Sequence, residues 1–134
     1  KCSFLETRIE KACKLAEVNE KFYLATNAMW SYRLNFMPAI KISVIWSGIE
    51  ALFMIDHNIK NTIATVSSRF IYGNDDKIED IKNLYKEARC KATHEYQNGT
   101  YDLYKKSNEL LYKLILKCID EGHTPDVNYI LTIF

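Results

Sequence analysis

The chain has 134 residues, the length of a single domain, and 48% of them are hydrophobic, which is enough for a packed core. Its net charge of +1 excludes the strongly basic surface that duplex-DNA binders present. Four glycines and two prolines are too few turn residues for a β-sandwich of this size. We therefore expect one all-α domain over residues 1–134, a bundle of four to five helices joined by short links.

The first part of the chain predicts one long helix followed by a connection. Ser3 and Glu6 have the spacing of a capping box, with Ser3 as the N-cap residue. Apolar residues follow at helical spacing, so this helix should run from about Phe4 into the mid-twenties. Residues 29–37 have no clear period and are interpreted as a connection or a frayed helical end.

The stretch from Ala39 to Ile55 is the most apolar part of the chain. It is shorter than the roughly 20 apolar residues that span a bilayer, and it contains Lys41 and Glu50. It therefore predicts a core helix and no membrane segment, with Pro38 in the first helical turn. We expect this helix to lie at the centre of the bundle, because an apolar stripe runs along it at Ile42, Ile45, Ile49 and Leu52.

Three further helices are predicted from the second half of the chain. One should cover about 61–72 and end at Gly73, since glycine readily adopts the left-handed conformation that closes a helix. The next should be capped by residues 74–76 and continue through 78–92, with acidic residues favourable near its N-terminus. The last long helix should cover about 101–120.

The two ends of the chain carry less information. Gly122 should end the last long helix, and Pro125 should prevent it from restarting. The apolar tail 127–134 is expected to pack as a final helical turn or strand, or to contact a missing neighbour. The chain begins at Lys1 without a methionine, which favours an origin within a longer protein that has a flanking domain.

Four cysteines indicate the compartment. They are Cys2, Cys13, Cys90 and Cys118, and no two of them form a CxxC pair. The first two should lie on or beside one helix, too far apart to form a disulfide. Free thiols in a reducing compartment are the simplest interpretation, and no signal peptide is visible, so we expect a cytoplasmic protein.

Arg89 and His94 form the first candidate site. A guanidinium can hold a phosphate through two N–H groups, and an imidazole can transfer protons near neutral pH. Together they suit cleavage of RNA by attack of its own 2′-hydroxyl, which requires no metal. In an α-helix, residues five apart are rotated by about 140° beyond one full turn. The two side chains converge if the helix loosens near His94, or if two subunits bring their copies together; otherwise they are a surface arginine and a helix-terminal histidine.

Glu50 is the second candidate, because it lies within an otherwise apolar helix. A buried carboxylate needs a partner, and Arg89 on a neighbouring helix is the expected one, which would orient the guanidinium. On a continuous helix Glu50 would share a face with Trp46, Phe53 and His57. The alternative is a glutamate at the edge of the buried face that bonds to solvent.

Cys90 and His94, four residues apart, could form a thiolate nucleophile or half of a zinc site. With only two ligands nearby, we expect no metal and no cofactor. Among the tyrosines around the motif, Tyr85 is expected to pack against the core, and Tyr96 is left open between packing and stacking on a base. Lys91 and Tyr96 are the candidate RNA contacts.

Residues 45–53 (IWSGIEALF) and 83–94 (NLYKEARCKATH) occur in that order. Together they resemble the HEPN family, in particular its Apea-like branch, which has a buried helix with a small-Ile/Leu-Glu-Ala-Leu motif and a later helix with Leu-Tyr and an Arg-x4-His pair. The resemblance implies a helical bundle that forms a homodimer and cleaves RNA without a metal in a composite groove, in phage defence or with an antitoxin partner. Arg89 and His94 match the two catalytic positions.

Two residues depart from the family pattern. Cys90 stands where a polar residue often follows the arginine, and Glu95 stands where glycine often follows the histidine in this branch. Some members of the family are non-catalytic. The alternative function is therefore a non-catalytic helical module for dimerisation or interaction within a larger protein.

Overall fold

The computed structural model describes residues 2–31, 37–92 and 100–133, and within these ranges all side chains except those of 2–6, 90–92 and 100. These residues form seven α-helices, one π-helical segment and no strand, so the predicted all-α class is confirmed. The helices are more numerous than the four to five predicted. They are α1 (Cys2–Val18), α2 (Glu20–Ser31), α3 (Pro38–Phe53), α4 (Ile59–Tyr72), α5 (Ile78–Leu84), the π-helix η2 (Tyr85–Ala92), α6 (Thr100–Glu121) and α7 (Val127–Thr132).

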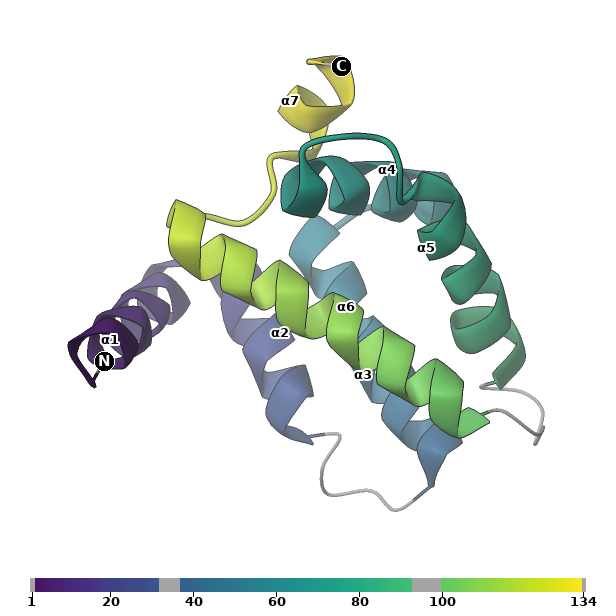
Figure 1. Cartoon of the computed structure of the whole chain (residues 1–134), viewed down its shortest axis with the longest axis horizontal. Helices are drawn as coiled ribbons and strands as arrows, with labels where there is room; N and C mark the ends of the chain where they lie inside the picture. Colours follow the sequence, from purple (N-terminus) through teal and green to yellow (C-terminus); the bar gives the residue numbers. More distant parts are fainter. Residues whose placement is uncertain (1, 32–36, 93–99, 134) are drawn as a thin grey trace.

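Helix α6 crosses over α2 and α3, and α4 and α5 lie to one side of this crossing (Figure 1). Helix α1 projects from the opposite side, and α7 lies beside α4 (Figure 1). The predicted central helix is α3, whose apolar stripe is completely buried at Ile42, Ile45, Ile49 and Leu52. No helix in the described part of the chain has the length and apolar character needed to cross a membrane.

The helix predicted from Phe4 into the mid-twenties is two helices, because the chain breaks at Asn19. The Asn19 side chain accepts a hydrogen bond from the backbone N–H of Phe22 at 3.1 Å, as an N-cap residue does at the start of a helix. Its amide also donates to the Thr124 hydroxyl at 3.2 Å, which ties the break to the segment after α6. At the other end, the predicted N-cap Ser3 lies inside α1, which already begins at Cys2.

The predicted connection 29–37 is helical over its first three residues, because α2 continues to Ser31. Residues 32–36 lie outside the described part of the chain.

Helix α4 ends at Gly73 as predicted, with a left-handed φ of 74°. Residues 74–76 do not cap the next helix. Asp75 instead accepts two hydrogen bonds from the Arg69 guanidinium, at 2.7 and 3.2 Å, and Asn74 accepts one from the backbone N–H of Asp76. The carboxylate bonds to a charged donor in preference to a backbone N–H, so the N-terminus of α5 has no side-chain cap.

Of the predicted alternatives for the tail, the helical turn is right. Helix α7 is capped by Asp126, which accepts a hydrogen bond from the Tyr129 backbone N–H at 3.2 Å. Ile130 is 7% exposed and joins the core. The Arg69 side chain donates to the carbonyls of Ile130 and Leu131, so one guanidinium joins the end of α4 to α7.

Helices α2 and α3 approach each other closely at Gly48. A Cβ atom added there would lie 2.6 Å from the Ala28 Cβ, which no rotamer change can relieve. Glycine-to-alanine in an open helix adds about 1 kcal/mol of stability. Here we expect the opposite sign: Gly48→Ala should lower the free energy of unfolding by about 1–3 kcal/mol in urea titrations. The double variant with Ala28→Gly should recover part of this loss, and a stabilising Gly48→Ala would contradict the close approach.

The two cysteine side chains in the described part of the chain are both free thiols, and their surroundings differ. Cys118 is fully buried in α6, and burial raises the pKa of its thiol to about 12. At pH 8 only about one Cys118 in 10⁴ is therefore a thiolate, the reactive form. With iodoacetamide and peptide mapping by mass spectrometry, we expect exposed Cys13 to be alkylated readily and Cys118 only after denaturation. Equal labelling of the two in the folded protein would contradict this burial.

Candidate functional site

Two side-chain contacts join α3 to η2 at the candidate site. Arg89 Nε donates to Glu50 Oε2 at 2.8 Å, which is the contact expected from the sequence. One helical turn away, the Trp46 and Tyr85 rings meet edge to face, with centroids 5.4 Å apart and an interplanar angle of 86°. The residues of each helix are four apart, so the ion pair and the aromatic pair together fix the position of η2 against α3.

Trp46 is also held from the side of α6. Its indole Nε1 donates to the Ser107 hydroxyl at 3.0 Å, and both residues are completely buried. Sequence reasoning missed Ser107. The signal was a single polar residue on the buried face of a helix, where hydroxyl groups normally have a hydrogen-bond partner. Trp46 therefore links α3, η2 and α6 at one point beneath the ion pair.

Arg89 lies in a π-helix, which changes its expected geometry. In this conformation the backbone bonds connect residues five apart, so such residues are about one turn apart. The rotation of 140° expected for an α-helix therefore does not apply over Tyr85–Ala92. The helix is already widened from Tyr85, and the expected loosening near His94 lies outside the described residues. Widened turns of this kind occur frequently at functional sites.

The ion pair lies at the protein surface. The Arg89 side chain is 38% exposed and that of Glu50 is 27% exposed. The guanidinium is therefore partly open to solvent while Glu50 bonds to its Nε, and a guanidinium presents five N–H donors in a rigid plane. The alternative of a Glu50 bonded only to solvent is wrong.

Several predicted site residues fall outside the described residues. They are His94 and Tyr96, together with the side chains of Cys90 and Lys91. One further expectation is corrected: His57 does not share a face with Glu50, because α3 ends at Phe53. His57 is highly exposed and pairs with Asp56 at 2.8 Å, which lowers the pKa of that carboxyl.

The remaining cations and tyrosines have mostly structural contacts. Tyr85 packs on Trp46 as expected, and Tyr101 and Tyr104 form a tilted pair with centroids 5.9 Å apart. Arg69 is held by Asp75, whose pKa it lowers through their hydrogen bonds. The described side chains contain no group of three or more His, Cys, Asp or Glu that could hold a metal ion.

Comparison of the chain with models of protein families, with curated proteins and with solved structures found no match. A function is therefore inferred from the residues and their geometry, together with the resemblance of two short segments to a family pattern.

Proposed function

We propose that the chain is one subunit of a dimeric, metal-independent endoribonuclease of the HEPN type. The observation that supports this most strongly is the ion pair between Glu50 and Arg89, which is accessible and joins the two segments that carry the family-like pattern. The π-helical conformation around Arg89 adds to this support, because widened turns of this kind occur frequently at functional sites. A setting in phage defence, or with an antitoxin in the cytoplasm, follows from the family pattern alone.

In the proposed reaction, the 2′-hydroxyl of a ribose attacks the adjacent phosphorus and the 5′-oxygen of the next nucleotide leaves. His94 transfers protons, removing one from the attacking hydroxyl or supplying one to the leaving oxygen. Arg89 stabilises the negative charge that develops on the phosphate oxygens, and Glu50 keeps the guanidinium oriented. Lys91 and Tyr96 contact the RNA on either side of His94. The products are a 2′,3′-cyclic phosphate and a 5′-hydroxyl end.

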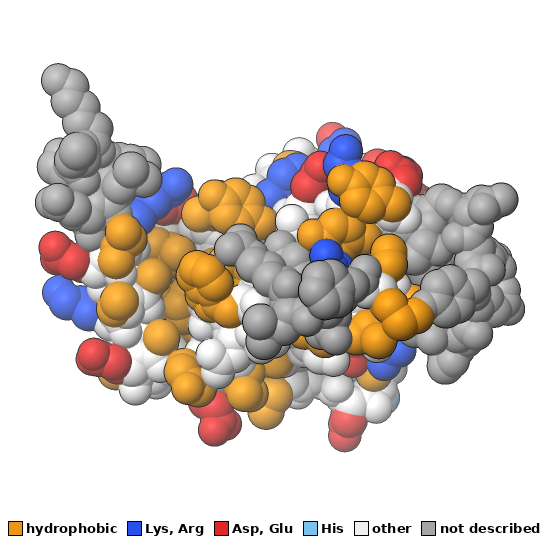
Figure 2. Space-filling model, turned by 90° about the horizontal axis from the view of Figure 1, so that it is seen from below, with side chains coloured by type: hydrophobic (Ala, Val, Ile, Leu, Met, Phe, Trp, Pro, Cys, Tyr) orange, Lys and Arg blue, Asp and Glu red, His pale blue; other side chains and the backbone are white. Residues whose placement is uncertain are grey.

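A second copy of the chain would complete the composite groove in which the RNA is cleaved. The lower end of the molecule, where α2 ends and α3 and α6 begin, presents hydrophobic side chains to solvent (Figures 1 and 2). Trp30 and Tyr101 are 64% and 65% exposed, and Met37 and Ile40 are each 43% exposed. Clusters of large exposed apolar side chains are typical of protein interfaces, so this end supports association of two subunits.

The test is RNA cleavage in the presence of EDTA, with the wild-type chain compared with Arg89→Ala and His94→Ala. The oligomeric state of each protein is measured by light scattering, and its fold by circular dichroism. Cleavage by the wild type alone, with 2′,3′-cyclic phosphate ends, is the expected result. Equal cutting by all three proteins, or no cutting by a folded dimer, would sink the proposal.

The second candidate function is a non-catalytic interaction module. The exposed hydrophobic lower end supports this role as well, since a binding surface needs no catalytic histidine. The two functions differ in their dependence on His94. An interaction module keeps its biological activity in the His94→Ala variant, whereas a ribonuclease loses it.

A further inference from the structure

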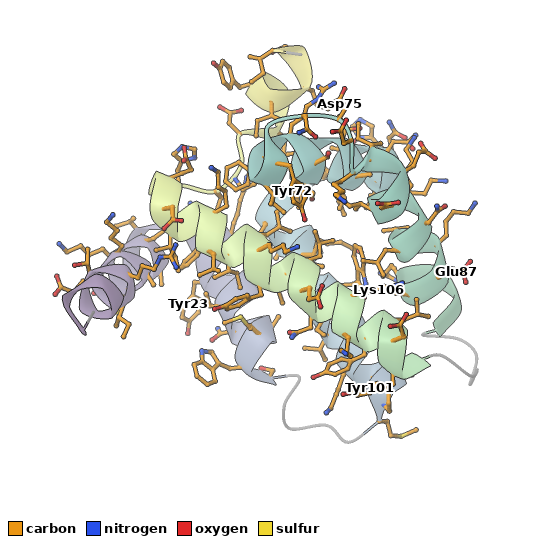
Figure 3. All side chains as sticks on the ribbon, in the orientation of Figure 1. Tyr23, Tyr72, Asp75, Glu87, Tyr101 and Lys106 are labelled. Atoms are coloured by element: carbon orange, nitrogen blue, oxygen red, sulfur yellow. The ribbon has the colours of Figure 1, made fainter. Side chains whose placement is uncertain are left out.

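A groove is lined by residues from the end of α4, from α5 and η2, and from α6. In Figure 1, α4 and α5 lie on the side of the molecule away from α1. The volume of the groove is about 590 Å³. The floor is apolar: Ile81 and Leu110 are each 6% exposed, and Leu84 and Leu103 line the groove beside them. In Figure 3, Tyr72 points from α4 toward α6 across this opening. None of the residues that line the groove belongs to the Arg89–Glu50 pair.

Two ammonium groups gather around Tyr72 at the mouth of the groove. Lys113 Nζ donates to the Tyr72 hydroxyl at 3.1 Å and lies 5.5 Å from the ring centroid. Lys77 Nζ, from the start of α5, lies 6.0 Å from the same ring. The hydrogen bond to Tyr72 raises the pKa of Lys113, so this lysine stays protonated. The mouth therefore presents a tyrosine hydroxyl and two positive charges, which suits an anionic group.

Each of these lysines has an acidic residue about one helical turn along its own helix. Asp80 Oδ2 lies 3.9 Å from Lys77 Nζ, and Glu109 lies four residues before Lys113, close enough for its charge to raise the pKa of that lysine. Both acidic residues line the groove together with both lysines. The mouth thus carries a Lys–acid pair on each side, above an apolar floor.

We propose that this groove binds a short apolar peptide with both termini free. The carboxylate terminus lies at Lys77 and Lys113, the amino terminus faces Asp80 and Glu109, and the apolar side chains rest on the floor. Along each helix the lysine and its acidic neighbour are about one turn apart, a rise of about 5.4 Å. Two extended residues span up to about 7 Å, so the two charged termini of a dipeptide can reach the lysines and the acidic residues together. A volume of about 590 Å³ falls within the usual range of about 300–1,000 Å³ for ligand sites.

Other small ligands match fewer of these features. A simple anion makes no use of the apolar floor, and a fatty acid brings no cation to Asp80 and Glu109. A ligand with two opposite charges and an apolar body has a counterpart for the lysines, for the acidic residues and for the apolar floor. The proposal does not depend on the proposed ribonuclease activity, because it uses neither Arg89 nor His94.

The probe is the dipeptide Leu-Leu, titrated into the full chain by isothermal titration calorimetry. Three related ligands each remove one feature: Leu-Leu amide lacks the carboxylate, N-acetyl-Leu-Leu lacks the ammonium, and Ala-Ala lacks the apolar bulk. We expect the amide and the N-acetyl derivative each to bind about tenfold more weakly than Leu-Leu, the effect of losing one charge-assisted contact. Ala-Ala should bind about 100-fold more weakly or worse, because it lacks six apolar carbon atoms that Leu-Leu buries on the floor. Leu-Leu binding without these differences, or no binding up to millimolar dipeptide, would overturn the proposal.

Lys113→Met tests the cationic mouth, because it removes the charge and keeps the apolar stem. It should weaken binding of Leu-Leu about tenfold and leave binding of the amide unchanged. Lys105→Met is the matched control on α6: Lys105 Nζ lies 5.9 Å from the Tyr101 ring but does not line the groove. An equal loss in both variants would contradict the site. Arg89→Ala should bind Leu-Leu as the wild type does, so this test and the cleavage test fail independently.

Discussion

Arg89→Ala is expected to lower the rate of RNA cleavage about 100- to 1,000-fold, the usual effect of removing one donor that stabilises a charged transition state. The folded state should lose only about 1 kcal/mol, because Glu50 is 27% exposed and its carboxylate can turn to water. Single-turnover cleavage with saturating protein measures the first quantity, and urea unfolding measures the second. A rate loss that merely follows a loss of folded protein would contradict a chemical role for Arg89.

The chain offers a matched control for this substitution. Arg8 also pairs with a carboxylate: its Nε and Nη2 donate to Asp120 at 3.2 and 2.9 Å, and its side chain is 32% exposed, against 38% for Arg89. Arg8→Ala should therefore cleave RNA at the wild-type rate. Arg89→Lys should recover little activity, because an ammonium cannot bond to Glu50 and grip a phosphate through one planar group. Full activity in Arg89→Lys would show that only the charge matters.

Trp46→Ala is expected to lower the free energy of unfolding by about 3–5 kcal/mol, the usual cost of removing a large aromatic side chain from a core. Trp46 is completely buried and contacts three elements at once, since it belongs to α3, donates to Ser107 of α6 and packs against Tyr85 of η2. Its loss leaves a cavity and a buried hydroxyl without its indole donor. Chemical denaturation followed by far-UV circular dichroism measures the change without depending on tryptophan fluorescence.

Two variants separate the parts of this effect. Tyr112→Ala removes an aromatic side chain that is 51% exposed on α6, and it should change stability by only about 0.5 kcal/mol. Ser107→Ala leaves the indole N–H of Trp46 without its acceptor, which should cost about 1–3 kcal/mol. A loss for Trp46→Ala no greater than that for Tyr112→Ala would show that Trp46 does not join the three helices.

The central helix and the Glu50–Arg89 contact were predictable because both follow from strong, simple preferences. The apolar stripe of α3 repeats at helical spacing over four positions, and all four are buried. A carboxylate among such residues requires a partner, and Arg89 was the cation expected on a neighbouring helix. In the first case the requirement is burial of the apolar side chains, and in the second it is a partner for the carboxylate. Each requirement is strong enough for the local sequence to predict the outcome.

The break at Asn19 and the π-helix were not predictable from the same patterns. At Asn19 the apolar spacing continues, but the side chain bonds to a backbone N–H and to Thr124, more than 100 residues away in sequence. In η2 the helix widens where Tyr85 and Arg89 both contact α3. The spacing of apolar residues does not predict to which carbonyl each backbone N–H donates. Tertiary contacts determine which of these hydrogen bonds form.

We expect the same break at Asn19 to divide the chain into two cooperative units. Of the α1 side chains from Thr7 to Val18, only Leu15 is buried, and Arg8 adds a surface ion pair to α6. An element with so few core contacts opens at a lower free energy than the body that contains α3 and α6. We therefore expect the backbone amides of α1 to exchange their hydrogens with solvent through sub-global opening. Those of α3 should exchange only when the whole chain unfolds. Asn19 marks the boundary between these two cooperative units.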